Sequence, residues 1–139
     1  MIKRSIPFLI FLILAAAFFY YYWSGGLIAN SPTDMLATAK SFLEDIGAGR
    51  IDNAYGRTSA SFRNHHSPEQ FRSLLDKHPV LKTNTTRNVN GYEIISTWTR
   101  GAAEYNVTLL QAKESLPVQL RLVTEEAVWK VDELAVRAK

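Results

Sequence analysis

A run of nineteen uncharged residues, Ser5–Trp23, constrains this chain more than any other part of its sequence. At about 1.5 Å per helical residue it reaches about 28 Å, close to the roughly 30 Å hydrocarbon core of a bilayer. Lys3 and Arg4 precede the run and four aromatic residues close it, as is usual at a membrane interface. The sequence therefore predicts a transmembrane helix with a bilayer partner at residues 5–23 and the N-terminus in the cytoplasm.

A cleaved signal peptide is the alternative interpretation, because a basic start, an apolar run and the small residues at 24–26 are all present. Signal peptides usually carry apolar runs of about 7 to 15 residues, whereas this run is longer and ends in bulky aromatics. These features favour an uncleaved, single-pass signal anchor over residues 1–24, in the inner (cytoplasmic) membrane. The rest of the chain is then expected in the periplasm or outside the cell. Since the sequence has no cysteine, lipid attachment at cysteine and disulfides are excluded.

Length and charge indicate one ordinary domain beyond the anchor. Residues 32–139, after a linker at 25–31, are enough for a single domain with its own hydrophobic core. Of the 16 lysines and arginines, two precede the apolar run, which leaves 14 cations against 13 anions. Nucleic-acid-binding surfaces concentrate cations on one face, and here the signs alternate along the chain. We expect no nucleic-acid partner.

The first part of this domain has helical patterns. Ser31 and Pro32 form a helix start, and apolar residues then recur at helical spacing until Gly47 and Gly49 end the pattern, with Asp45 mostly off the apolar stripe. Asp52 is predicted to cap a shorter helix that runs through Thr58. A third helix is predicted from the capping-box sequence Ser67–Gln70 to the residue before Pro79.

From residue 80 onward the helical spacing is lost, and β-branched and aromatic residues alternate with polar ones between turn signals. After a first extended piece at Val80–Val89, the pattern predicts four strands: Tyr92–Thr99, Ala103–Ala112, Pro117–Thr124 and Ala127–Val136. Their short connections predict an antiparallel meander. The fold class is therefore α+β, with about three helices packed on one face of a curved sheet of four or so strands.

The order of several short motifs resembles the nuclear transport factor two-like superfamily, whose cone-shaped fold is also called cystatin-like, and in particular its small membrane-anchored bacterial envelope members. The motifs are GRIDNAY at Gly49–Tyr55, TSASFR at Thr58–Arg63, SPEQF at Ser67–Phe71 and AVWKVDEL at Ala127–Leu134, after Ala39 and Phe42 on the first helix. The resemblance covers residues 33–137. It implies either a ligand or active site in the cavity between sheet and helices, or partner binding through the sheet.

Catalytic chemistry has little support in the sequence. Isomerase-type members of the superfamily need a tyrosine donor and a carboxylic acid in an apolar pocket. Tyr55 is a candidate donor, but Glu93, Glu104 and Asp132 fall on the polar side of the strand pattern or beside turns. The histidines at 65, 66 and 78 lack the i, i+4 spacing of helical metal sites, and there is no nucleophile elbow or phosphate loop. We expect no metal and no cofactor.

Two functions remain open. The first is a membrane-tethered extracytoplasmic binding or assembly module, which captures another envelope protein or an apolar small molecule through its cavity or sheet face. The alternative is a small isomerase- or lyase-type enzyme with its site in the cone cavity. Aromatic residues suit the lining of a gap between helices and sheet. The candidates for ligand or partner binding are Tyr55, Phe62, Trp98 and Tyr105.

Overall fold

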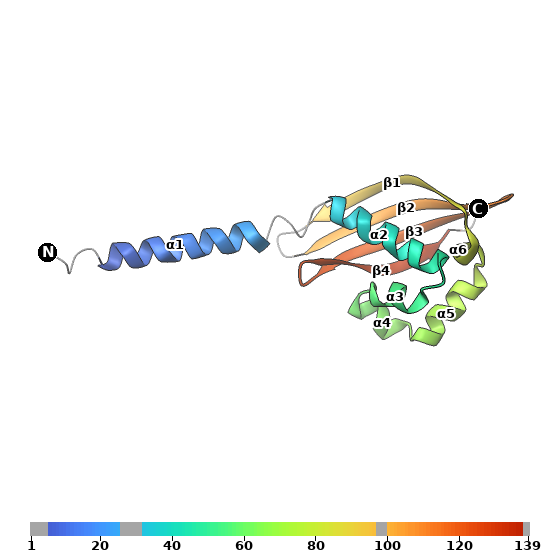
Figure 1. Ribbon diagram of the computed structural model, residues 1–139, viewed down its shortest axis with the longest axis horizontal. Coiled ribbons are helices and arrows are strands. Elements are labelled where there is room, and N and C mark those ends of the chain that lie inside the picture. Colours follow the sequence, from blue (N-terminus) through green and yellow to red (C-terminus); the bar gives the residue numbers. More distant parts are fainter. Residues whose placement is uncertain (1–5, 26–31, 97–99, 138–139) are drawn as a thin grey trace.

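The computed structural model describes residues 6–25, 32–96 and 100–137, which form six helices and one four-stranded antiparallel sheet (Figure 1). The predicted α+β class is confirmed. The helices are α1 (Ile6–Gly25), α2 (Pro32–Gly47), α3 (Ile51–Gly56), α4 (Ala60–His65), α5 (Pro68–Lys77) and α6 (Val80–Thr83). The strands are β1 (Thr86–Ser96), β2 (Gly101–Gln111), β3 (Glu114–Glu125) and β4 (Val128–Val136).

The N-terminal helix α1 lies apart from the domain that α2–β4 form (Figure 1). Its side chains are described over residues 10–20, where large apolar groups are exposed, among them Phe11 at 69% and Leu14 at 63%. Among the residues described, no helix is both long and apolar enough to cross a membrane. The membrane crossing expected for Ser5–Trp23 includes residues outside this description and stays a prediction.

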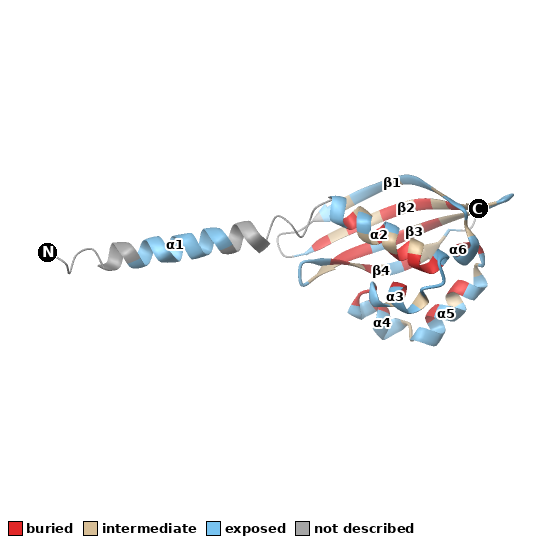
Figure 2. Ribbon diagram, in the orientation of Figure 1, coloured by how far each residue is buried: buried red, intermediate tan, exposed pale blue. Residues whose placement is uncertain are grey.

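The sheet is a meander in the order β1-β2-β3-β4, as the short connections predicted. Alternate residues of β2 are buried, and Tyr105, Val107 and Leu109 point toward the helices. We call this side the inner face of the sheet and the opposite side its outer face. The helices of the domain cover the inner face, and Figure 2 shows buried residues on α2 and on strands β2, β3 and β4.

The core lies between α2 and the inner face of the sheet. The predicted apolar stripe of α2 is confirmed, since Met35, Phe42 and Ile46 are fully buried. Predicted helix α5 is confirmed with its capping box, in which the Ser67 hydroxyl accepts a hydrogen bond from the Gln70 amide and the Gln70 side chain accepts one from Ser67. These local signals agree with the tertiary packing.

Two short helices change the predicted count from about three helices in the domain to five. Asp52 does not cap the second helix, because α3 begins at Ile51 and Asp52 lies in its first turn, 2.9 Å from an Arg72 nitrogen. The predicted continuation to Thr58 is wrong, since α3 ends at Gly56. A separate six-residue helix, α4, follows and was not predicted, because six residues are too few to show a periodic pattern.

The predicted extended piece at Val80–Val89 is wrong over its first half. Pro79 has a helical φ of −56° and directly precedes α6, which buries Val80 and Leu81 in the core. The burial of these two apolar side chains stabilises this single turn. The sheet begins at Thr86 instead, so the strand expected at Tyr92–Thr99 is the second part of β1, and residues 97–99 lie outside the described residues.

Candidate functional site

Two of the predicted aromatic site residues meet around Phe71 in the core. The Tyr55 ring centre lies 5.7 Å from that of Phe71, and the Tyr55 hydroxyl donates a hydrogen bond of 2.7 Å to the His66 carbonyl. The Phe62 ring packs edge-on against Phe71, also at 5.7 Å, and only 3% of Phe62 is exposed. Both side chains therefore hold α3, α4 and α5 together, a structural use of large apolar surface.

Tyr105 is placed elsewhere, on the inner face of β2 between Tyr92 of β1 and Leu120 of β3. Burial raises the pKa of its hydroxyl above the usual 10.0, although the positive charge of Arg87 lowers the pKa in part. Tyr105 therefore stays neutral at physiological pH. Trp98, the fourth candidate, lies outside the described residues.

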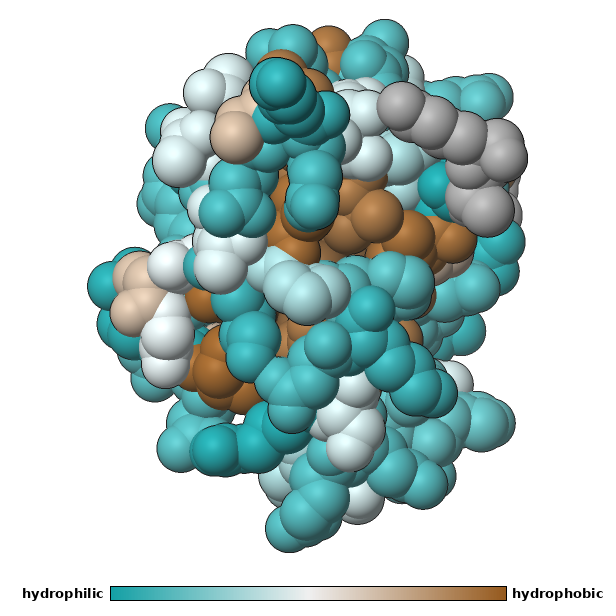
Figure 3. Space-filling model, turned by 90° about the vertical axis from the view of Figure 1, so that its right-hand side faces the viewer, coloured by the Kyte–Doolittle hydropathy of each residue, from teal (hydrophilic) through white to brown (hydrophobic). Residues whose placement is uncertain are grey.

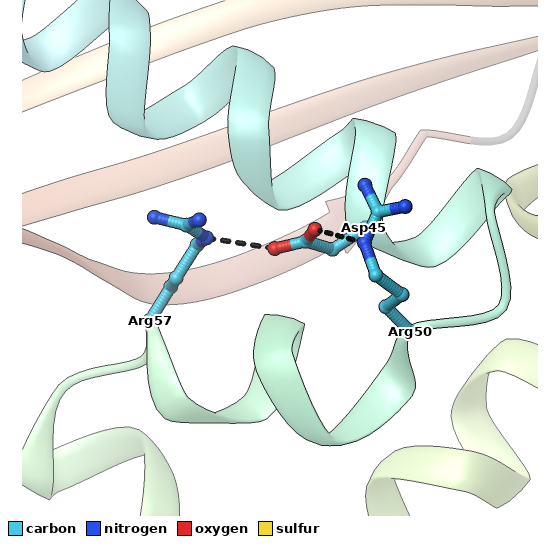
Figure 4. A network of polar contacts seen from close by, with 3 residues as sticks. All are labelled: Asp45, Arg50 and Arg57. Atoms are coloured by element: carbon cyan, nitrogen blue, oxygen red, sulfur yellow. Dashed lines mark hydrogen bonds and ion pairs between the residues drawn. The ribbon is translucent and has the colours of Figure 1, made fainter.

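A buried carboxylate, Asp45, sits near the C-terminal end of α2 between two arginines (Figure 4). The Nε of Arg50 donates to one Asp45 oxygen at 2.9 Å, and the Nε of Arg57 donates to the other at 2.8 Å. Arg50 precedes α3 and Arg57 follows it. The carboxylate therefore joins both ends of α3 to α2, and the terminal nitrogens of both arginines point away from it (Figure 4).

The charge of Asp45 decides what it can do chemically. Burial by itself would raise its pKa, but the hydrogen bonds and charges of Arg57 and Arg50 outweigh burial and hold the pKa below its usual 3.8. Asp45 is thus ionised at neutral pH and fully paired. An isomerase of the kind weighed above needs a carboxyl group kept protonated or basic by an apolar pocket, and Asp45 has the opposite environment.

The sequence pattern missed Asp45, which it placed mostly off the apolar stripe of α2. Asp45 is only 4% exposed, beside Ile46 and three residues after Phe42, both fully buried. A signal was available, because a helical residue three positions from a buried one lies on nearly the same face. The two arginines that neutralise it come from positions 50 and 57, and their approach depends on the path of the chain around α3.

A second polar cluster lies where α4 meets β4. The buried Ser59 hydroxyl donates to an Asp132 oxygen at 2.6 Å and accepts from the Phe62 amide at 3.0 Å, which caps α4. The Ala60 amide is 3.1 Å from a Glu125 carboxylate oxygen. These contacts satisfy the open N–H groups of a short helix. Asp132, weighed above as a catalytic acid, thus has a structural partner.

Next to this cluster the chain forms an open pocket of about 560 Å³, lined by Ala60, Arg63, Glu125, Glu126, Val128 and Lys130. Both signs of charge are present, and Glu125 already binds the start of α4. The pocket offers polar contacts but no nucleophile with a base beside it.

Figure 3 shows the end of the domain that faces away from α1, where patches of apolar surface lie between hydrophilic side chains.

The outer face of the sheet carries a row of charged residues across all four strands. Glu93, Glu104, Arg121 and Glu133 are neighbours in this row. Arg121 lies 3.4 Å from Glu133 and 3.9 Å from Glu104, and its side chain is 54% exposed. Unlike the inner face, this surface is free of helices in the described part of the chain (Figure 1). It is a broad surface that carries this charged row beside the apolar residues Ile95, Ala102 and Val123, which suits contact with a protein more than enclosure of a small ligand.

Comparison with known proteins gives no match: no protein-family model and no curated protein sequence is similar to this chain.

Proposed function

We propose that this chain is a membrane-tethered binding module of the cone-shaped, nuclear transport factor two-like type, which captures a partner protein through the outer face of its sheet. In this proposal α1 and its flanking residues anchor the chain in the inner membrane, with the N-terminus in the cytoplasm. The domain then lies at the outer surface of that membrane. The observation that carries the proposal is a helix with exposed apolar side chains beside a domain whose inner face is filled and whose outer face is open.

The contrast between the two sheet faces favours the outer face over an internal cavity. Tyr55, Phe62 and Tyr105 were candidates for lining a cavity, and each packs in or against the core. Their burial supports a structural role. The outer-face residues Asn106 and Gln119 are half-buried neighbours in the middle of the sheet, where a flat partner surface can reach them. An enzymatic function is disfavoured. Asp45 is the only buried acidic residue among the described residues, and its carboxylate is paired with two arginines.

The tether is tested by the intact mass of the protein extracted from membranes. An uncleaved anchor predicts the full mass of the 139-residue chain, resistance to extraction at alkaline pH, and digestion of the domain by protease added to the outer side. A mature species that starts near Leu27 or Asn30 would contradict the anchor.

The binding face is tested by a photo-crosslinking amino acid placed at Gln119 in the full chain in its native membrane. The proposal expects a discrete adduct with one protein, and its loss when Arg121→Glu reverses the central charge of the outer face. The matched control carries the crosslinker at the exposed residue Asp52 on α3. Equal adducts from both positions, or an adduct that Arg121→Glu leaves unchanged, would refute the outer face as the binding surface.

A further inference from the structure

Strand β1 collects most of the exposed apolar surface of the domain. Val89, Tyr92 and Ile95 are 54%, 48% and 52% exposed. Among the described residues of the domain, Val128 is the only other large apolar residue that is exposed. β1 is also an edge strand of the described sheet, because among the described strands it pairs with β2 alone. The outward N–H and C=O groups of such a strand are a template for pairing with another extended segment.

A bulge divides β1 into two halves and changes which residues face inward. Val89 pairs with Val107 and Tyr92 pairs with Tyr105, so both lie on the inner face although they are three residues apart. The extra residue between the paired positions is Asn90, whose side chain donates to Thr108 on the outer face at 2.7 Å. Gly91 has a φ of +157°, a conformation that L-residues rarely adopt, which fits the bulge.

This shift decides in which register the strand can pair with a second copy of itself. Consider two copies of one regular strand that pair antiparallel about a two-fold axis. Each residue must lie opposite a residue of the same face, and in a regular strand such residues are an even number of positions apart. The bulge in β1 moves the faces by one residue. A symmetric pair centred between Asn90 and Gly91 therefore brings inner-face residues opposite inner-face residues, and outer opposite outer. The outward backbone groups follow the same shift.

We propose that two copies of this chain pair through their β1 edges in this register, with Val89 of each copy opposite Tyr92 of the other. The pairing covers Val89 and Tyr92, two of the three exposed apolar side chains of each β1. Because of the two-fold axis, this apolar cross-strand contact occurs twice on the inner face. On the outer face Asn88 lies opposite Glu93, and on the inner face Arg87 lies opposite Ile94, so no like charges meet. The two four-stranded sheets become one continuous sheet, and the interface is self-complementary as two-fold dimers require.

The register makes a test possible by disulfide trapping, because the natural chain contains no cysteine. Residues directly opposite each other have Cα atoms about 4.5–5.5 Å apart, within the range that a disulfide bridges. We expect a mixture of full-length Val89→Cys and Tyr92→Cys chains in detergent to form a mixed covalent dimer on mild oxidation. Val89→Cys alone should form far less, since its two copies are offset by three residues, or about 10 Å.

The matched control is Val128→Cys, which is exposed to the same extent as Val89 but lies outside β1. The mixed dimer should exceed the Val128→Cys dimer. For the natural chain in detergent, the molar mass of the protein within the protein–detergent complex should be that of two chains. Val89→Lys should weaken dimerisation about tenfold or more, which corresponds to a loss of about 1.4 kcal/mol. Circular dichroism checks that this exposed substitution leaves the fold intact.

A single-chain mass for the natural protein overturns the proposal, and so does a mixed disulfide yield equal to that of Val128→Cys. Pairing of the edge with a strand of a different protein would give this result, because the purified chain would then be monomeric. A dimer that survives Val89→Lys but is lost when α1 residues are changed would place the contact in the anchor and equally overturn the β1 interface. The outcome is independent of the outer-face crosslinks, so failure of either proposal can be told from failure of the other.

Discussion

At the β4 edge of the sheet, residues 57–59 pair in parallel with Val131, whereas at the β1 edge the strand ends the sheet with three exposed apolar side chains. The Ser59 amide donates to the Val131 carbonyl at 2.8 Å, and the Val131 amide donates to the Arg57 carbonyl at 2.9 Å. The covered edge is thus sealed by a segment that two side-chain clusters hold in place. No covering segment lies along the open edge in the described residues, and the bulge there places Val89 and Tyr92 on the same face.

The covered edge depends on partners from distant parts of the chain. Arg57 is held by Asp45 on α2, and Ser59 is held by Asp132 on β4. No such pair of polar clusters is found along β1 in the described residues, where Arg87 makes a long 3.9 Å contact with Glu44. We therefore expect substitutions at the covered edge to lower stability and substitutions at the open edge to alter association.

The largest effect is expected at Trp129, which is 3% exposed on β4. Trp129→Ala should lower the free energy of unfolding by about 3 to 5 kcal/mol, because it removes a large core side chain. Its indole N–H has no hydrogen-bond partner among the described residues, so Trp129→Phe keeps most of the volume and removes an unsatisfied donor. Denaturant unfolding of the full chain measures both. A loss below about 1 kcal/mol for Trp129→Ala would mean that this side chain is exposed.

Asp45→Asn should cost about 2 kcal/mol at neutral pH, since it removes two charge-assisted hydrogen bonds that place Arg50 and Arg57. The effect depends on pH in a defined direction. The folded-state pKa lies below the ordinary value of 3.8, so the stabilisation is complete above that value and is lost as the pH falls through the lower, folded-state pKa. Unfolding curves of both proteins should converge in acid. A difference that persists unchanged at low pH would show that the carboxylate charge is not responsible.

Ser59→Ala should cost about 1 to 2 kcal/mol, because it removes the cap of α4 and the donor to Asp132. Ser61→Ala, an exposed position on the same helix, is the matched control and should change stability by less than about 0.5 kcal/mol. Equal effects from the two serines would show that the Ser59 hydroxyl does not stabilise the covered edge.

The smallest effect is expected at the open edge, where Glu93 lies directly opposite Glu104. Like charges in this position destabilise a sheet, so Glu93→Lys should raise stability by about 0.2 to 1 kcal/mol. The measurement is best made in a Val89→Lys background, so that pairing between copies does not contribute. Glu133→Lys, which loses the 3.4 Å contact with Arg121, should not be stabilising. A gain from both substitutions would point to overall charge instead of the local pair.

The regular elements of the domain were predictable where local and tertiary preferences agree. The stripe of α2, the capping box of α5 and the alternation of β2 each reflect burial of one side of one element. The hairpins followed from short connections, although the β3–β4 turn uses Glu126 and Ala127 at φ of 50° and 64°, without the glycine such turns favour. The bulge in β1 lies at Asn90 and Gly91, a pair that by itself reads as a turn signal.

The sites were harder to predict than the elements. Tyr55, Phe62 and Tyr105 are aromatic residues that suit a gap between helices and sheet, but aromatic residues are as useful in a core as at a ligand. The Asp45 cluster was missed because its members come from α2 and from both sides of α3, and the apolar pattern of α2 ranks a carboxylate as a surface residue. Short helices such as α4 and α6 depend on a cap and on buried side chains more than on periodicity.

The sequence by itself determined the apolar N-terminal segment, the α+β order and the meander, because each follows from the composition of neighbouring residues. Only the tertiary structure decided that Asp45 is buried with Arg50 and Arg57, that one sheet edge is covered by residues 57–59, and that the bulge places Val89 and Tyr92 on one face. The physical reason is distance along the chain. A local pattern reports which face of an element is apolar, but burial of a charge or closure of an edge depends on which distant segment comes to lie against it.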